Sequence, residues 1–383
     1  MANNKRKVIV IGLDGLEPGI VEPMLAAGEL PNLARLRGTG GYGRVRTTVP
    51  AQTPVAWSSF ATGVNPGGHG IYDFLRRDPA TYLPDLALNR YEQKNAFLPP
   101  KAVNLRRGKA VWQLLSEAGI PSTVIRCPCT YPPDAIKGRM LSGMGVPDVR
   151  GGLGSSTFYT SSGEVRAEES EVVVRVAANG DGRIHTYLPG PRNPKTGNDI
   201  VLDLEVEPQP SRGSVVIRSD GEPGALEVKL GAWSDWLRVR FKVGMLQSVR
   251  GMVRLHLVRL EPTFELYASP VNFDPDAPLF PISSPWEYAA ELRRRVGNYH
   301  TTGMVEDHTG LNNRRFDEVA YLAQCADALR ERERMMLYEL ERFDEGFFFC
   351  LYDTPDRVQH MFWRFREDGH PANAGEPIRA EYR

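Results

Sequence analysis

Three short segments of the sequence carry side chains that could bind a divalent metal and support phosphoryl transfer. The first is an apolar run ending in Asp14, the second places Thr53 before a proline, and the third holds Asp356 and His360. In an open parallel sheet, ligands bind in the crevice outside the carboxyl ends of the strands. Because Asp14 and Asp356 each follow an apolar run with strand character, we predict that these segments meet at one such edge.

The segment around Thr53 suggests a nucleophile at the start of a helix. Thr53 stands before Pro54 and a helical run over residues 55–62, so it is predicted as the N-cap with proline at the first helical position. Free backbone N–H groups there could hold a phosphate, and a metal on the hydroxyl oxygen would favour the alkoxide. The alternative is that Thr53 only caps the helix, and this segment alone does not decide between the two.

Asp14, Asp356 and His360 are candidate metal ligands of unequal strength. Asp14 precedes a glycine, and an Asp-Gly pair after a strand is also a common turn. Asp356 and His360 are four residues apart and face the same side if the chain turns helical after Pro355, so both can reach one metal ion. The alternative is a helix-capping aspartate with a partly buried histidine, and it would be preferred if this segment stood alone.

Composition excludes several other classes of protein. The 383 residues include 47 basic and 47 acidic side chains, which leaves no basic excess for binding nucleic acid. The N-terminus runs into the first strand without a hydrophobic signal core, so we expect a cytoplasmic protein with no membrane partner. The four cysteines lack the repeated spacing of a zinc ribbon and are predicted to be free thiols.

A glycine-rich segment, Gly38–Gly43, matches the GxGxxG pattern of dinucleotide-binding proteins. That pattern requires a strand before the glycines and a helix after them. Here a helical stretch precedes the glycines and an extended stretch, Arg44–Val49, follows them. We therefore predict a connection from helix to strand and no dinucleotide cofactor.

The pattern of strands and helices divides the chain into three parts. Residues 1–155 alternate apolar strands with helical segments, which is typical of an α/β fold. Residues 156–275 show period-two alternation between turn residues and are predicted to be an inserted β-rich domain. Residues 276–383 return to the α/β pattern, with an amphipathic helix near 315–342 before the strand Phe347–Tyr352. The expected apolar stripe of that helix consists of Phe316, Val319, Leu322, Ala326, Leu329 and Met336.

Taken in order, the motifs resemble the alkaline phosphatase superfamily, and within it the type I phosphodiesterase/nucleotide pyrophosphatase group. The resemblance rests on Asp14 after its strand, Pro-x-x-Thr-Pro at Thr53, the segments Ala61–Pro66 and His69–Ile71, and Asp-x-x-x-His at residues 356–360. It implies an alkaline-phosphatase-like α/β core, with a mostly parallel sheet flanked by helices, and an inserted β-rich cap domain.

This resemblance also implies a function. The chain would be a metal-dependent phosphoric-ester hydrolase, either a phosphodiesterase/nucleotide pyrophosphatase or a phosphatase, acting on a small phosphorylated substrate. Thr53 would be the nucleophile in a site of two divalent metals, with Zn²⁺ as the first expectation and Mn²⁺ or Mg²⁺ as alternatives. Asp14 and Thr53 would bind one ion, and Asp356 and His360 the other. The enzymatic alternative is a phosphomutase of the same superfamily, and the other alternative is a non-catalytic scaffold whose β-rich part binds a partner.

Two features depart from the family pattern. The phosphodiesterases carry a phosphoryl-contacting asparagine where this chain has Tyr72-Asp73-Phe74. The family also supplies an Asp-His pair and a further histidine after the Asp-x-x-x-His motif, and His370 lies too near that motif to be the distant ligand. We therefore expect a C-terminally truncated core that lacks strands and metal ligands, with weak metal binding, negligible activity and poor solubility. Trp233, Trp236 and Glu306–His308 are candidates for selecting the substrate, and the sequence does not favour one of them over the others.

Overall fold

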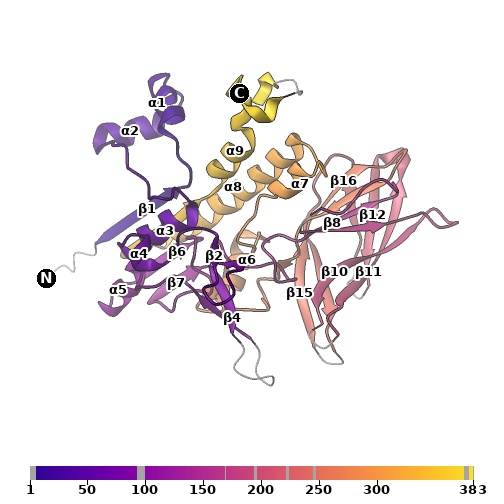
Figure 1. Cartoon of the computed structure of the whole chain (residues 1–383), viewed down its shortest axis with the longest axis horizontal. Coiled ribbons are helices and arrows are strands. Elements are labelled where there is room, and N and C mark those ends of the chain that lie inside the picture. The colour runs from indigo at the N-terminus through magenta and orange to yellow at the C-terminus, as the bar shows by residue number, and fades with distance from the viewer. Residues whose placement is uncertain are drawn as a thin grey trace.

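The computed structural model contains two regions of different architecture that lie side by side (Figure 1). One is a mainly parallel sheet with helices on both faces, and the other consists mainly of antiparallel strands. The residues that the structure describes are 6–92, 100–168, 170–193, 196–220, 224–244, 247–374 and 379–382. The four candidate site residues all belong to the first region.

The strand order of the mixed sheet brings distant parts of the chain together. It runs β1 (Lys7–Leu13), β20 (Gly346–Tyr352), β6 (Ser122–Ile125), β7 (Gly138–Leu141) and β19 (Ser283–Ser284). Neighbours from β1 to β7 are parallel, and β19 pairs antiparallel with β7. The amide of Asp14 donates to the carbonyl of Tyr352 at 2.9 Å, directly beyond the paired residues. The carboxyl ends of β1 and β20 therefore meet, and the predicted mostly parallel sheet is confirmed.

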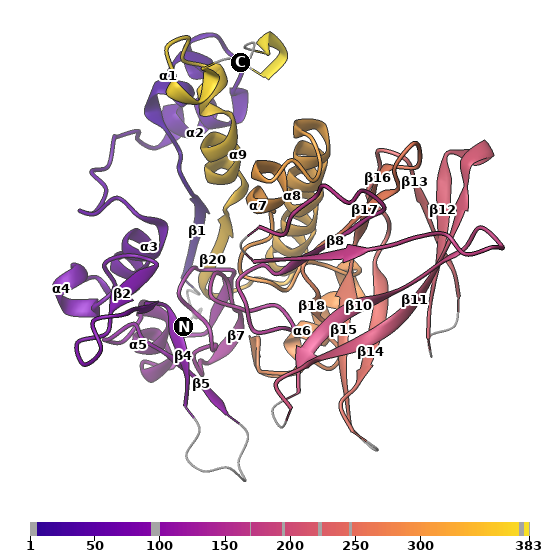
Figure 2. The ribbon, with the colours of Figure 1, turned by 45° about the vertical axis from the view of Figure 1, so that its right-hand side comes forward.

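Helices cover both faces of this sheet (Figure 2). One face carries α3 (Thr53–Thr62) and α5 (Val111–Glu117), and the other carries α6 (Tyr288–Val296) and α8 (Glu318–Glu341). In β20, Phe349 packs with Trp57 and Trp112 on the first face, whereas Phe348 packs with Leu292 on the second. Because successive residues of a strand point to opposite faces, the continuous apolar run of β20 supplies both cores.

The long helix α8 is present, but only part of the predicted apolar stripe is buried: Leu322 and Met336 pack against the core. Val319 and Leu329 are 61% and 43% exposed, whereas Glu331, Arg332 and Glu339 are buried. Each of those three charged side chains makes a hydrogen bond to a residue of another segment. The prediction was therefore wrong for Val319 and Leu329, because apolar periodicity does not reveal a helix face that buries charges with their partners.

The β-rich region, defined as residues 156–273, has its own apolar core. Its strands are ordered β10-β11-β12-β13, β14-β15-β18 and β16-β17-β8-β9. The side chains of Phe241, Leu257 and Leu266 are fully buried among them. The strands are β8 (Ser156–Thr160), β9 (Glu171–Arg175), β10 (Ile184–Arg192), β11 (Asp199–Gln209), β12 (Ser214–Ser219), β13 (Leu226–Lys229), β14 (Leu237–Lys242), β15 (Ser248–Val253), β16 (Leu255–Arg259), β17 (Glu265–Ala268) and β18 (Asn272–Phe273).

The remaining elements are short, and the helices and strands among them lie outside the β-rich region. They are α1 (Pro18–Ala26), α2 (Pro31–Thr39), α4 (Pro66–His69), β2 (Leu75–Arg77), β3 (Pro84–Leu86), β4 (Asn89–Glu92), β5 (Lys101–Asn104), α7 (His308–Asn312) and α9 (Thr354–Phe362), with 3₁₀ turns at Pro210–Arg212, Trp363–Phe365, Pro371–Asn373 and Ala380–Tyr382. The glycine-rich segment does follow a helix, α2, but residues 44–49 contain no strand.

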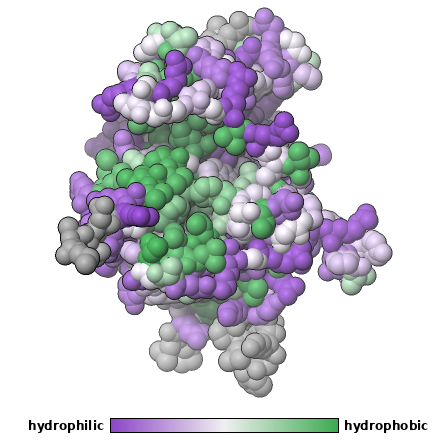
Figure 3. Space-filling model, turned by 90° about the vertical axis from the view of Figure 1, so that its left-hand side faces the viewer, coloured by the Kyte–Doolittle hydropathy of each residue, from purple (hydrophilic) through white to green (hydrophobic). Residues whose placement is uncertain are grey.

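Strand β1 forms an edge of the mixed sheet and exposes apolar side chains. Within the described residues it pairs with β20 alone. Val8, Ile9 and Ile11 are 53%, 52% and 42% exposed, and Figure 3 shows apolar surface gathered on this side of the molecule. An exposed apolar edge strand is a template for association with another chain. Poor solubility therefore stays a prediction with a structural reason.

Two further sequence predictions concern the cysteines and the membrane. All four cysteines are buried free thiols, as predicted. In the part of the chain that the structure describes, no helix combines the length and the apolar character needed to cross a membrane.

Candidate active site

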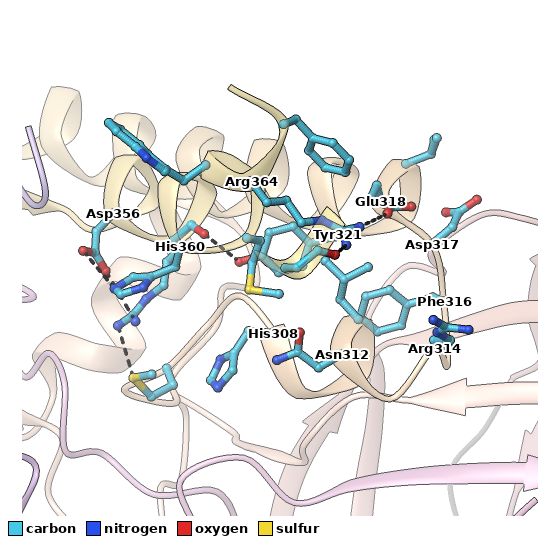
Figure 4. Close-up of a pocket in the computed structure, with 18 of the residues that line it drawn as sticks. His308, Asn312, Arg314, Phe316, Asp317, Glu318, Tyr321, Asp356, His360 and Arg364 are labelled. Atoms are coloured by element: carbon cyan, nitrogen blue, oxygen red, sulfur yellow. Dashed lines mark hydrogen bonds and ion pairs between the residues drawn. The ribbon is translucent and has the colours of Figure 1, made fainter. Parts of the chain in front are cut away.

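A cleft of about 1290 Å³ opens beside the carboxyl ends of β1 and β20. Thr53 lines it from the start of α3, and Asp356 and His360 line it from α9. Figure 4 shows His308 and Asn312 of α7 across the cleft from those two α9 residues. The cleft is therefore bounded by both the sheet edge and helices that follow the β-rich region in sequence.

Asp14 and Thr53 are hydrogen-bonded to each other. The Thr53 hydroxyl donates to Asp14 Oδ2 at 3.0 Å, and Trp57 Nε1 donates to Asp14 Oδ1 at 2.9 Å. Burial raises the pKa of Asp14, and the negative charge of Asp356 adds to this effect. Thr53 is the first residue of α3, whereas Gln52 occupies the N-cap position that was predicted for Thr53. The correction is a shift of one residue, and Gln52 has the extended backbone conformation of an N-cap.

Asp356 and His360 lie on the same side of α9, as their spacing predicts. His360 Nε2 is 3.4 Å from Asp356 Oδ1, and the hydrogen bond with Asp356 raises the pKa of the imidazole. The other carboxylate oxygen, Asp356 Oδ2, is buried and has no hydrogen-bond partner among the described residues. It lies 3.6 Å from the guanidinium Nη1 of Arg357, which is too far for a hydrogen bond.

The two pairs are in contact through Gly15. This glycine has a φ of +64°, and a Cβ added to it would lie 2.9 Å from Cα of Asp356 and 3.0 Å from its Oδ1. A residue with a side chain would therefore push the segment after β1 away from α9. The structure thus brings Asp14, Thr53, Asp356 and His360 together. Among the described residues, no three His, Cys, Asp or Glu side chains cluster closely enough to hold a metal ion.

A layer of buried charge beneath the site was not anticipated. Glu306 accepts a hydrogen bond from Thr354 Oγ1 at 2.7 Å, and burial, with a contribution from nearby Asp353, raises the pKa of Glu306. Burial also raises the pKa of Asp353, but the positive charges of Arg332, Arg126 and Arg357 outweigh it and leave this pKa below its usual value. One feature of the sequence could have indicated this layer: Asp353 directly follows β20, at the edge of the sheet where the site lies.

Other histidines and aromatic residues have defined positions. His69 is buried between the hydroxyl of Ser59, at 2.9 Å, and the amide of Ile71, at 3.1 Å. Trp233 donates to the Ala320 carbonyl at 2.8 Å and packs against α8. The segment Glu306–His308 was one of the candidates for substrate selection. Its His308 lines the cleft, and burial lowers the pKa of this histidine.

A family model matches the chain over residues 8–187. It is that of type I phosphodiesterase / nucleotide pyrophosphatase. This family belongs to the alkaline phosphatase superfamily, so the resemblance inferred from the motifs is confirmed. The match includes Asp14 and Thr53 and ends in β10, whereas Asp356 and His360 lie beyond it. No curated protein and no solved structure matches the chain.

The match to this family model supports a general class of activity. Its members are hydrolases of phosphoric esters, they act on small phosphorylated substrates, and they generally depend on metals. The family resemblance therefore supports an enzyme, without specifying the nucleophile or the metal ligands of this chain.

Proposed function

We propose that this protein is a metal-dependent phosphoric-ester hydrolase in which Thr53 is the nucleophile. The observation that carries the proposal is the 3.0 Å hydrogen bond from the Thr53 hydroxyl to Asp14, at the edge where α9 brings Asp356. A threonine that served only as a helix cap would direct its oxygen to backbone N–H groups. This hydroxyl is instead oriented by a carboxylate and faces the cleft.

In our proposal, four side chains bind two divalent ions, with only two protein ligands for each ion. Asp14 with Thr53 would hold one ion, and Asp356 with His360 the other. The unpartnered Oδ2 of Asp356 supports this assignment, because a buried carboxylate oxygen is expected to have a partner. Zn²⁺ suits this mixture of oxygen and nitrogen ligands, with Mn²⁺ or Mg²⁺ as alternatives. Two protein ligands per ion predict weak binding, since a tight zinc site has three or four.

The bound ions would lower the pKa of the Thr53 hydroxyl and stabilise charge on the phosphoryl group. Asp14 orients the hydroxyl, and the N-terminus of α3 presents its positive end to an anion. Thr53 Oγ1 would lose its proton to water and form a bond to phosphorus, while the bond to the leaving oxygen breaks on the opposite side and that oxygen takes up a proton from water. Water hydrolyses the phospho-threonine and restores the hydroxyl.

The test is hydrolysis of an aryl phosphate and an aryl phosphodiester with excess Zn²⁺ or Mn²⁺, which compensates for weak binding. Thr53→Ala should lower turnover by about 10³-fold or more, because catalysis that depends on a covalent intermediate loses its nucleophile. Thr53→Ser is the matched control, since it keeps the hydroxyl and should retain part of the activity. Equal rates for the wild type and Thr53→Ala would contradict the proposal. The alanine variant should lose at most about 1 kcal/mol of stability.

A further inference from the structure

Arg357 is a buried arginine in the wall of the cleft whose donors are poorly used. Its side chain is 8% exposed. Nη1 lies 3.6 Å from Asp356 Oδ2, and Nη2 donates to the sulfur of Met304 at 3.2 Å. Nε has no hydrogen-bond partner among the described residues. A guanidinium carries five N–H donors, and a thioether sulfur is a weak acceptor.

Such an arrangement is costly without a ligand. Burying a charge is unfavourable unless it is paired and hydrogen-bonded, and the penalty per ion is several kcal/mol. The nearest carboxylate, Asp356, does not satisfy Arg357, because both groups retain a buried atom with no hydrogen-bond partner among the described residues. In the proposed hydrolase, Asp356 would bind a metal ion. Arg357 would then require another anion.

The position of Arg357 identifies that anion. Arg357 lines the same cleft as Thr53, Asp356 and His360, which places it among the side chains of the proposed site. Two other arginines that line the cleft are already paired, since Arg364 and Arg379 lie 3.3 and 3.1 Å from the Glu318 carboxylate. Figure 4 shows the pairing of Arg364 with Glu318 away from Asp356.

We propose that Arg357 binds the non-bridging oxygens of the reacting phosphoryl group and makes the site prefer a dianionic phosphomonoester over a monoanionic phosphodiester. This inference rests on the proposed function, because it assumes that the phosphoryl group lies beside Thr53. A guanidinium binds two phosphate oxygens in a bidentate manner, and its attraction grows with the charge of the group. A monoester presents three non-bridging oxygens and two charges, whereas a diester presents two oxygens and one charge.

The segment at the place of the family's asparagine supports the same preference. Tyr72-Asp73-Phe74 contains no amide side chain, and Phe74 lines the same cleft as Thr53. A neutral amide would bind a singly charged phosphoryl group with little electrostatic preference. Here a cation adjoins the site and an aromatic ring lines the cleft, so the balance shifts toward the more highly charged group.

A competing explanation is that Arg357 only balances buried carboxylates. Its charge does act on Glu306 and Asp353, which lie beneath the site. In that case, replacing Arg357 would change stability without changing which anion binds. The experiment must therefore measure the choice between two anions as well as the strength of binding.

The test uses two non-hydrolysable probes of similar shape, phenylphosphonate and its monomethyl ester, which are dianionic and monoanionic at pH 8. Calorimetric titration with excess Mn²⁺ should show that the wild type binds phenylphosphonate about 10-fold more tightly than the ester, which corresponds to one charge-assisted interaction. Arg357→Gln should remove this difference. Arg357→Lys keeps a charge but loses the planar fork, so it should retain part of the preference.

Arg364→Gln is the matched control, because it removes another cleft arginine that has its own carboxylate partner. It should leave the preference unchanged. Three results would overturn the inference: no preference in the wild type, no binding of either probe to it, or an unchanged preference in both Arg357 variants. Failure of the proposed function is recognised separately, by equal turnover of the wild type and Thr53→Ala.

Discussion

The β-rich region and the site edge of the mixed sheet have opposite kinds of interior. The β-rich region buries apolar side chains such as Phe241 and Leu266. The site edge buries charged groups in which one polar atom has no hydrogen-bond partner, such as Glu306 Oε2 and Arg357 Nε. Among the described residues, every Asp, Glu or Arg atom of this kind lies outside residues 156–273. We infer that one region supplies stability while the other accepts a cost in stability for its chemistry.

The largest expected effect on stability lies in the β-rich region. Phe241 is fully buried, and a Cβ added to Gly190 would lie 2.2 Å from its ring. Phe241→Ala should lower the free energy of unfolding by about 3–5 kcal/mol, because it leaves a cavity that the sheets cannot fill. Val201→Ala, at a 47% exposed position, should change it by at most about 0.5 kcal/mol. Denaturant titration measures the free energy of unfolding of both variants. If both substitutions have similarly small effects, the claim that the apolar core of the β-rich region supplies stability is wrong.

An intermediate effect on stability is expected for Asp353 and Glu306, two buried carboxylates beneath the site, and it differs in sign between them. At pH 8, Asp353→Asn should cost about 3 kcal/mol, because it leaves buried arginines without their counter-charge. Glu306→Gln should instead raise the free energy of unfolding by about 1 kcal/mol, since burial and Asp353 disfavour its charge. The two isosteric substitutions thus have opposite signs. Chemical denaturation of both variants measures these changes. If Glu306→Gln lowers the free energy of unfolding, the charge of Glu306 does not destabilise the folded protein.

The smallest effect is an acid response that both regions share. Burial lowers the pKa of His69 at the mixed sheet and of His256 in the β-rich region below 6.5. Below pH 6.5 the unfolded chain therefore binds protons that the folded chain does not, so stability should fall as the pH falls. Each histidine contributes at most about 1.4 kcal/mol per pH unit.

Replacement of one histidine tests this response. His256→Phe should reduce the loss of stability between pH 7 and pH 5, because it removes a buried imidazole whose pKa is lowered. The measurement is the urea midpoint at each pH. A midpoint that rises on acidification would show that the sign is wrong.

The sequence predicts those elements whose pattern is local. Strands β1 and β20 are continuous apolar runs, and α3 begins at a proline signal, so their positions follow within about a residue. The face of α8 could not be predicted, because Glu331 and Glu339 are buried with partners distant in sequence. Residues 44–49 have strand-like composition but no strand, since pairing depends on a neighbour that composition does not reveal.

The candidate site shows the same limit. Asp14, Thr53, Asp356 and His360 could be selected from residue type, spacing and position at strand ends. Arg357 could not, although it is adjacent to Asp356, because an arginine in a helix is usually solvated. Only its burial and its unused Nε distinguish it. The roles of all these residues as ligands, nucleophile or phosphoryl contact stay predictions until metal and substrate analogues are bound.

The most direct test of the central claim is anomalous scattering from crystals of this protein soaked in Zn²⁺. Our account predicts two peaks about 4 Å apart, one beside Asp14 and Thr53 and the other beside Asp356 and His360. Partial occupancy is expected, because each ion has only two protein ligands. Zinc bound elsewhere in the molecule, with no peak at these four side chains, would contradict the account.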